Sequence, residues 1–226
     1  MNGILILLLL ILAAALPAII VFFWYQKKNS AVTMPWFLIS ILAGILSLFA
    51  AAIIQRSSVF DHDSFKSVLS GIFIRVAFVE ELSRLITLIP LLIMAARHNK
   101  KGISFGASIG LVSGLGFAMI ENAMHGMADI NIILLRIFTA VPIHSACGIR
   151  AGAAISVFNK SKGKTIFYFI YAVLVHGTYN LIILSPAYPS FLVFFLAYAV
   201  LISTLPLLKT TDSDNEKDQI PTPLTP

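Results

Sequence analysis

Long runs of apolar residues alternate with short polar segments along the chain. A helix needs roughly 20 predominantly apolar residues to cross the hydrocarbon core of a bilayer, and several runs reach that length. The pattern therefore predicts an all-α integral membrane protein, a bundle of about seven transmembrane helices. The predicted spans are residues 4–25, 35–54, 68–96, 103–124, 131–158, 165–185 and 190–208.

The two ends of the chain predict different structures. The first apolar run contains Ala13, Ala14 and Ala15, which resemble a signal-peptide cleavage site, but it lacks a basic start and stays apolar to Phe23. We therefore expect a retained helix and one polytopic transmembrane domain over residues 1–208. The polar segment 209–226, rich in acidic residues and proline, predicts a disordered cytoplasmic tail.

The distribution of charged residues predicts how the bundle is oriented in the membrane. Hydrophobic residues make up 58% and charged residues 12% of the chain, whereas soluble domains have about 25% charged residues. The net charge is +6, but the basic residues lie in short loops, where they set topology and do not indicate nucleic acid as a partner. The loops after the first, third and fifth spans hold Lys27, Lys28, Arg97, Lys100, Lys101, Lys160, Lys162 and Lys164. The opposite loops hold only Arg56 and Lys66, so the positive-inside rule predicts an external N-terminus and a cytoplasmic C-terminus.

Two further features limit how the bundle is held together. The single cysteine, Cys147, excludes an internal disulfide and a thiolate zinc cluster. Glycines at four-residue intervals predict close packing of the fourth span on a neighbour, in a bundle whose interior can hold polar side chains. These glycines are Gly102, Gly106, Gly110 and Gly114, with Gly148 and Gly152 at the same spacing in the fifth span.

The third span carries ionisable residues near its middle. Each such side chain costs about 2.5–3.5 kcal/mol at the bilayer centre, so Arg75, Glu80, Glu81 and Arg84 would together cost on the order of 10–14 kcal/mol if unpaired. Arg84 is four residues after Glu80 and three after Glu81, so it can pair with either on one helix face. One carboxylate would then be held ionised and the other left free. The alternative is a buried ion pair that only fixes helix packing.

The fourth span ends in a Phe-x-x-x-Glu-Asn segment formed by Phe117, Glu121 and Asn122. Taken alone, Glu121 is most simply an interfacial carboxylate at the outer end of its helix. It becomes a candidate for chemistry because the neighbouring spans also carry ionisable groups.

The fifth and sixth spans each place a histidine near mid-membrane. His144 follows Pro142, which bends a helix and frees a carbonyl, as sites within membranes often require. His176 and Asn180 are four residues apart and share one helix face. A single buried histidine is more often a packing residue, but two in a bundle that also buries three glutamates favour a site.

The residue types allow two mechanisms. Imidazole and carboxylate groups are common zinc ligands, and three protein ligands with a water form a catalytic site. Without metal, a carboxylate could polarise water, an imidazole could carry the proton and Asn180 could donate to an oxyanion. The zincin signature His-Glu-x-x-His is absent, and spacing alone does not separate the two mechanisms. No role is assigned to His62, His98 and His125.

Four segments in order resemble the PrsW-type intramembrane metalloproteases. They are Glu80-Glu81-Leu82-Ser83-Arg84, Gly116 to Asn122, Pro142-Ile143-His144 through Gly148, and His176-Gly177-Thr178-Tyr179-Asn180. The resemblance covers roughly residues 75–182, within a catalytic core near 68–185, and extends to the wider group of CAAX prenyl proteases, bacteriocin-processing Abi proteins and the Aph subunit of gamma-secretase. Glu121 is similar to the PrsW branch, since the CAAX branch typically has histidine there.

The resemblance implies a peptidase of a bacterial or archaeal plasma membrane that cleaves a membrane protein, such as a single-pass anti-sigma factor, on its outer side. It also implies a metalloprotease, and we expect catalytic roles for Glu80, Glu81, Arg84 and Asn180, with Asn180 either stabilising the oxyanion or orienting His176. A divalent metal, with zinc first, is expected on His144, His176 and Glu121, supported by Phe117 and Asn122, unless Glu121 instead supports the ligands from behind. Two departures are Arg84, where relatives often have lysine, and Asn180, where some have aspartate. The alternatives are a CAAX-type endopeptidase, a non-catalytic scaffold and an ion-coupled transporter.

Overall fold

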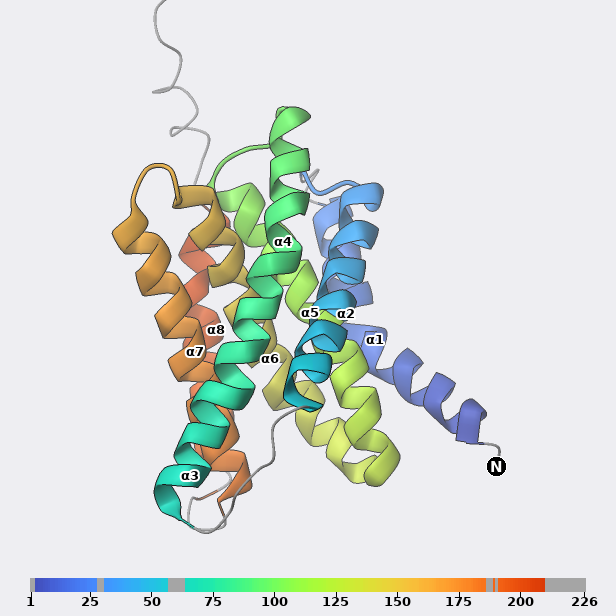
Figure 1. Cartoon of the computed structure of the whole chain (residues 1–226). Helices are drawn as coiled ribbons and strands as arrows, with labels where there is room; N and C mark the ends of the chain where they lie inside the picture. Colours follow the sequence, from blue (N-terminus) through green and yellow to red (C-terminus); the bar gives the residue numbers. More distant parts are fainter. Residues whose placement is uncertain (1–2, 28–30, 57–63, 186–188, 190, 210–226) are drawn as a thin grey trace, which may run out of the picture.

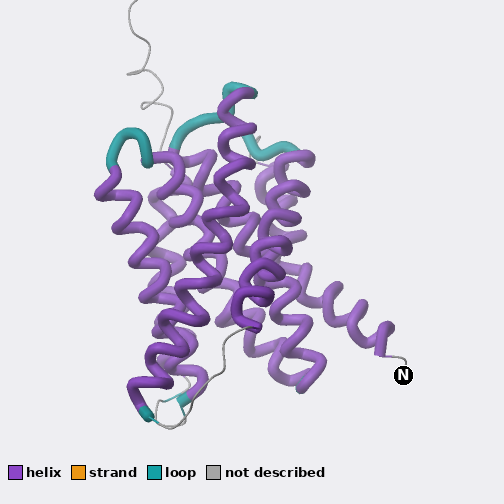
Figure 2. The backbone as a smooth tube through the Cα atoms, viewed as in Figure 1, coloured by secondary structure: helices purple, strands orange, loops and turns teal. Residues whose placement is uncertain are grey.

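The computed structural model describes residues 3–27, 31–56, 64–185, 189 and 191–209. Within these residues the structure has helices and no strand, so the all-α prediction is confirmed (Figure 2). The predicted disordered tail lies outside the described residues, except for Lys209. The elements are α1 (Gly3–Lys27), α2 (Met34–Arg56), α3 (Phe65–Ser70), the π-helix η1 (Gly71–Phe78), α4 (Val79–Arg97), α5 (Ile103–Ala128), α6 (Ile130–Val157), α7 (Lys162–Leu184) and α8 (Phe191–Lys209).

The helices form a bundle whose long axes run between two opposite faces (Figure 1). Six of the described helices are long and apolar enough to cross a membrane: α1, α2, α5, α6, α7 and α8. The predicted third span corresponds to α3, η1 and α4, which continue one another from Phe65 to Arg97 and carry the charged residues of the interior. The start of α1 and the end of α8 lie at opposite ends of the bundle (Figure 1).

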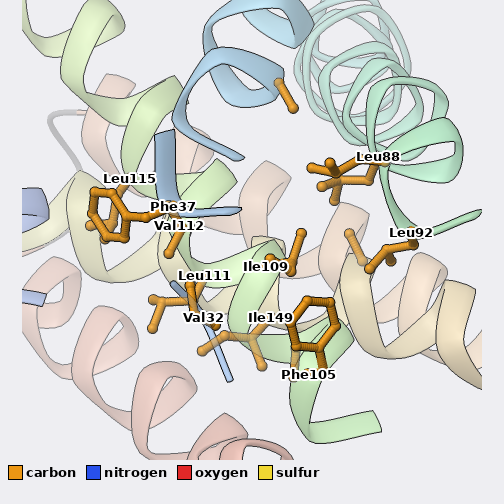
Figure 3. Packing of buried hydrophobic residues seen from close by; sticks show 14 of the residues in the cluster. Val32, Phe37, Leu88, Leu92, Phe105, Ile109, Leu111, Val112, Leu115 and Ile149 are labelled. Carbon is orange, nitrogen blue, oxygen red and sulfur yellow. The ribbon is translucent and has the colours of Figure 1, made fainter. Parts of the chain in front are cut away.

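The surface of the bundle is apolar and much of its polar chemistry is inside. Large hydrophobic side chains such as Ile53 (74% exposed) and Phe195 (72% exposed) face outward, as lipid-facing residues do. The apolar core lies between α2, α4, α5 and α6, where Phe37, Leu88, Ile109 and Ile149 are buried (Figure 3). Buried serine, glutamate, arginine and histidine side chains share this interior, which indicates a site kept away from lipid.

Glycines let α5 and α6 approach at backbone distance, as the stripe predicts. A Cβ added at Gly110 would overlap the carbonyl of Gly148, and one added at Gly106 would overlap the carbonyl of Gly152. Gly102 is different, because it precedes α5 with a positive φ of 101° and has open space around it. The close contact between α5 and α6 places the first half of α5 directly beside the second half of α6.

A π-helical segment leads into the charged part of α4. The eight residues of η1 lie immediately before Val79, and π-helical turns are rare and frequently found at functional sites. Phe73 of η1 packs on Gly177 of α7, where an added Cβ would overlap the phenyl ring. This contact fixes the position of η1 relative to the turn of α7 that carries His176.

Candidate active site

Four helices bring the predicted acidic and imidazole groups into one buried cluster. Glu80 and Glu81 come from α4, Glu121 from α5, His144 from α6 and His176 from α7. Glu81, His144 and His176 are each at most 1% exposed, Glu80 is 6% exposed and the Glu121 side chain 18% exposed. Residues separated by up to 96 positions in the chain (from Glu80 to His176) therefore meet inside the bundle.

Glu81 uses both of its carboxylate oxygens inside the cluster. Its Oε1 lies 2.8 Å from Nδ1 of His176, and its Oε2 accepts a hydrogen bond from Arg84. Of the two pairings open to Arg84 on its own helix, the structure thus forms the one three residues away. A carboxylate bonded on both sides is suited to hold its neighbours in place, and it keeps the Arg84 charge compensated.

Glu80 is the freer of the two adjacent carboxylates. Its Oε1 accepts a hydrogen bond of 3.1 Å from the amide of Gln55 on α2. Its Oε2 is buried without a hydrogen bond and lies 3.4 Å from Nε2 of His176. One oxygen is therefore positioned by the protein while the other faces an imidazole, an arrangement suited to accept a proton from water.

Glu121 joins the cluster from the opposite side. Its Oε2 lies 2.7 Å from Nε2 of His144 and 2.6 Å from a guanidinium nitrogen of Arg136. The Nε of Arg136 also donates to Oδ1 of Asn122 at 2.8 Å. Arg136 thus contacts both Glu121 and Asn122. Glu121 is therefore a member of an ion pair inside the bundle and not a lone interfacial carboxylate.

Aromatic and cationic contacts connect the two halves of the cluster. The rings of His144 and His176 lie edge to face with centroids 5.0 Å apart. Phe117 lies 4.8 Å from the His144 ring, and the Arg84 guanidinium stacks over Phe117 at 4.7 Å. Arg84 also approaches Nδ1 of His144 at 3.4 Å. Phe117 therefore provides an apolar wall against which the central cation and one imidazole are held.

Asn180 is the predicted site residue that the structure does not bring into the cluster. It is half-buried on α7 one turn after His176, and no hydrogen bond joins it to another described residue. Of the histidines given no role, His98 contacts Trp36 far from the cluster, and His62 lies outside the described residues. His125 is half exposed and approaches Glu121 at 3.7 Å, a contact that the sequence analysis did not anticipate.

Sequence reasoning missed two residues that contact the site. Arg136 lies in the predicted fifth span. An arginine inside an apolar run, one helical hairpin away from Glu121, could have been recognised from the sequence as a partner of that carboxylate. Gln55 ends an apolar run, and nothing in the local sequence separates it from an ordinary polar helix end. Its role follows only from the way that α2 packs on α4.

The cluster fits a divalent metal in chemistry and charge. Oε2 of Glu80 is buried without a hydrogen bond, and Oε2 of Glu121 and Nε2 of His144 face each other at 2.7 Å. Carboxylate oxygen and imidazole nitrogen are the zinc ligands expected from the sequence. Three carboxylates and two arginines also leave one negative charge uncompensated when both imidazoles are neutral. Among the described residues, however, no three histidine, cysteine, aspartate or glutamate side chains converge as a metal-binding group in this arrangement.

Part of the cluster lies nearer one face of the bundle, whereas His144 lies at the middle of α6 and Glu80 at the middle of the continuous segment α3–η1–α4. Glu121 is ~10 Å from the end of α5 and His176 ~12 Å from the end of α7, at about 1.5 Å of rise per helical residue. The segments 98–102 and 158–161, which carry basic residues, lie on the other face (Figure 1). The cluster therefore extends from the middle of the bundle toward the face without these basic loops.

Comparison with protein families gave one finding. A family model described as PrsW family intramembrane metalloprotease matches residues 32–205. The matched region begins just before α2, ends within α8 and contains every residue of the cluster. Searches of curated proteins and of solved structures found no match.

Proposed function

Because the chain belongs to the PrsW family of intramembrane metalloproteases, and so is a peptidase of the membrane, we propose that the buried cluster hydrolyses a peptide bond in or near the transmembrane segment of a membrane protein. The observation that carries the proposal is the continuous set of contacts from Glu80 through His176, Glu81 and Arg84 to His144 and Glu121. The family membership favours this activity over a scaffold or a transporter.

In the proposed mechanism Glu80 acts as the general base. Its Oε2 takes a proton from the attacking water, while Gln55 fixes the other oxygen. Glu80 then gives this proton to the leaving amine, while Nε2 of His176, 3.4 Å from Oε2 of Glu80, is the nitrogen that would face the metal. Glu81 holds Nδ1 of His176 and so directs Nε2 toward the reacting groups, and Arg84 keeps Glu81 ionised. Asn180 is proposed to donate to the oxyanion when substrate is bound.

A divalent metal, with zinc as the ion that best suits the donors, would be held by Glu121, His144 and His176. When bound, it would polarise the scissile carbonyl as a Lewis acid. Arg136 and Asn122 fix the orientation of Glu121, and Phe117 packs against the ring of His144. These contacts orient the proposed ligands in the way that supporting residues around metal sites generally do.

The proposed substrate is a single-pass membrane protein, such as an anti-sigma factor, cut toward the outer side of the membrane. The basic segments 98–102 and 158–161 support a cytoplasmic location for their face, with the N-terminus outside and the C-terminus inside. Glu121 and His176 lie nearer the opposite face, which supports cleavage on the outer side.

The test uses purified full-length protein in liposomes with a single-pass substrate whose outer juxtamembrane segment is labelled. Wild type is expected to release the labelled fragment, and His176→Ala is expected to lose at least about 100-fold in rate because it removes a proposed metal ligand beside the general base. His98→Ala is the matched control, since His98 is distant from the cluster. Equal cleavage by wild type and His176→Ala would refute the proposed mechanism.

A further inference from the structure

A second buried cation lies outside the catalytic cluster. Arg150 on α6 is 6% exposed. One of its terminal nitrogens donates to Oγ of Ser203 on α8 at 2.8 Å, and its guanidinium stacks over the ring of Tyr171 on α7 at 3.8 Å. Its Nε is buried without a hydrogen-bond partner. Three helices therefore enclose a guanidinium whose donors are only partly satisfied.

No carboxylate in the described part of the chain compensates this charge. Arg150 forms no ion pair there, and the sequence has no aspartate or glutamate between Asp129 and Asp212. Arginine stays protonated in proteins, so it cannot become neutral to suit an apolar interior. An uncompensated buried charge is strongly unfavourable, which points to an anion that is supplied from outside the described chain.

The position of Arg150 indicates where that anion comes from. Its Cα lies ~10 Å from the end of α6, and Ser203 lies ~9 Å from the end of α8, at about 1.5 Å per residue. Ser203 is exposed on the apolar outer surface of α8, so the guanidinium reaches the lipid-facing side of the bundle. The ends of the same helices carry exposed basic side chains, Lys162 and Lys164 on α7 and Lys209 on α8.

We propose that Arg150, Tyr171 and Ser203 form a binding site for the phosphate of an anionic phospholipid at the α6–α7–α8 surface. The planar guanidinium matches phosphate oxygens through two parallel hydrogen bonds, and its Nε, buried without a partner in the described protein, would be one of the two donors. Basic residues beside a pocket between transmembrane helices are typical of anionic headgroup recognition. The site binds the lipid from the leaflet on the side of the basic loops, away from the peptidase cluster.

The experiment measures lipid bound to the full-length protein by native mass spectrometry, during titration with phosphatidylglycerol in detergent micelles. Wild type is expected to retain phosphatidylglycerol at least about fivefold better than Arg150→Gln, which keeps a polar side chain beside Ser203 but loses the charge. Arg97→Gln is the matched control, with the same charge change on the same face, and is expected to bind as wild type does. Phosphatidylcholine is expected to bind all three proteins equally weakly.

A second variant keeps the proposal testable if Arg150→Gln does not fold. Ser203→Asp places a carboxylate beside the guanidinium and is expected to remove the preference for phosphatidylglycerol while the bundle stays intact. Truncation after Lys209 removes the acidic segment 210–226 and is expected to leave the preference unchanged. The proposal is overturned if Arg150→Gln or Ser203→Asp binds phosphatidylglycerol like wild type, or if Arg97→Gln loses as much binding as Arg150→Gln. It is also overturned if truncation abolishes the preference for phosphatidylglycerol, or if millimolar inorganic phosphate displaces the lipid.

Discussion

Glu81 and His176 lie 95 residues apart in the sequence and are joined by a contact of 2.8 Å between Oε1 and Nδ1. The other oxygen of Glu81 is bonded to Arg84, so this carboxylate is held on both sides. Its neighbour Glu80 has an oxygen without a hydrogen bond beside the same imidazole. Two adjacent glutamates therefore have different proposed tasks, one to position His176 and one to accept a proton.

Amide substitutions separate these two tasks. Glu80→Gln is expected to reduce cleavage by at least about 100-fold with little change in stability, because it removes the proposed base but leaves the Arg84 ion pair intact. Glu81→Gln is expected to lower the free energy of unfolding by about 3–5 kcal/mol, because Arg84 is left buried without a counter-charge. Cleavage rates and unfolding in mild detergent measure both effects. The assignment is wrong if Glu80→Gln cleaves normally while Glu81→Gln remains stable and inactive.

Arg136 is expected to position Glu121. Arg136→Gln removes the 2.6 Å ion pair and the donor to Asn122, so Glu121 is left buried beside His144 without its cation. We expect a loss of at least about 2 kcal/mol in stability, since one partner of a buried pair is removed, together with weaker metal binding by calorimetry. Arg56→Gln, at the exposed end of α2, is the control for the loss of one charge. If Arg136→Gln has the stability and metal binding of the wild type, Arg136 does not position Glu121.

The contact between Phe73 and Gly177 predicts that a larger side chain at position 177, next to His176, reduces cleavage. Gly177→Ala would overlap the phenyl ring, and overpacking typically costs about 1–3 kcal/mol while shifting neighbouring backbone. Cleavage is expected to fall because His176 moves relative to Glu80. The double variant Phe73→Leu with Gly177→Ala is expected to recover part of the rate. Gly163→Ala on the same helix has open space and is expected to behave as wild type, so an equal loss there would argue against a local clash.

Close packing of α5 on α6 predicts a purely structural phenotype. Gly110→Ala places a methyl group against the carbonyl of Gly148 and is expected to destabilise the bundle by about 1–3 kcal/mol. Both backbones line the contact, so neither can move away as a flexible side chain could. Thermal unfolding of the purified protein, with Gly163→Ala as the reference, measures the difference. Equal midpoints for the two variants would show that the glycines are not required for this packing.

The sequence predicts most of the fold because lipid imposes a simple requirement. Backbone hydrogen bonds must be satisfied internally, so each long apolar run has to be a helix, and each predicted span does correspond to helix in the structure. Nothing in the apolar pattern marks the π-helix before Val79, in which Phe73 packs on Gly177 of α7. Gly102 fits the four-residue spacing but precedes the helix, since spacing does not mark where a helix begins.

The candidate site was predictable to the extent that lone charges in apolar spans must find partners. This requirement predicts that Glu81, Glu121, His144 and His176 lie together, and the structure brings them together through Glu81–His176, His176–His144 and His144–Glu121 contacts. It did not decide which glutamate pairs with Arg84, because spacings of three and four residues are both allowed on a helix. The tertiary contact to His176 distinguishes them. Pairing between helices, as in Arg136 with Glu121, depends on helix rotation, which a single sequence does not specify.

The central claim is that residues on four helices form one metal-dependent peptidase site, and one measurement tests it most directly. Metal content by elemental analysis and cleavage of the single-pass substrate are determined on the same purified protein, with and without chelator, for wild type and His144→Ala. Wild type is expected to hold about one divalent ion per chain and to lose cleavage with chelator, and His144→Ala to lose both ion and cleavage. Full cleavage by His144→Ala or by chelated, metal-free wild type would contradict the account.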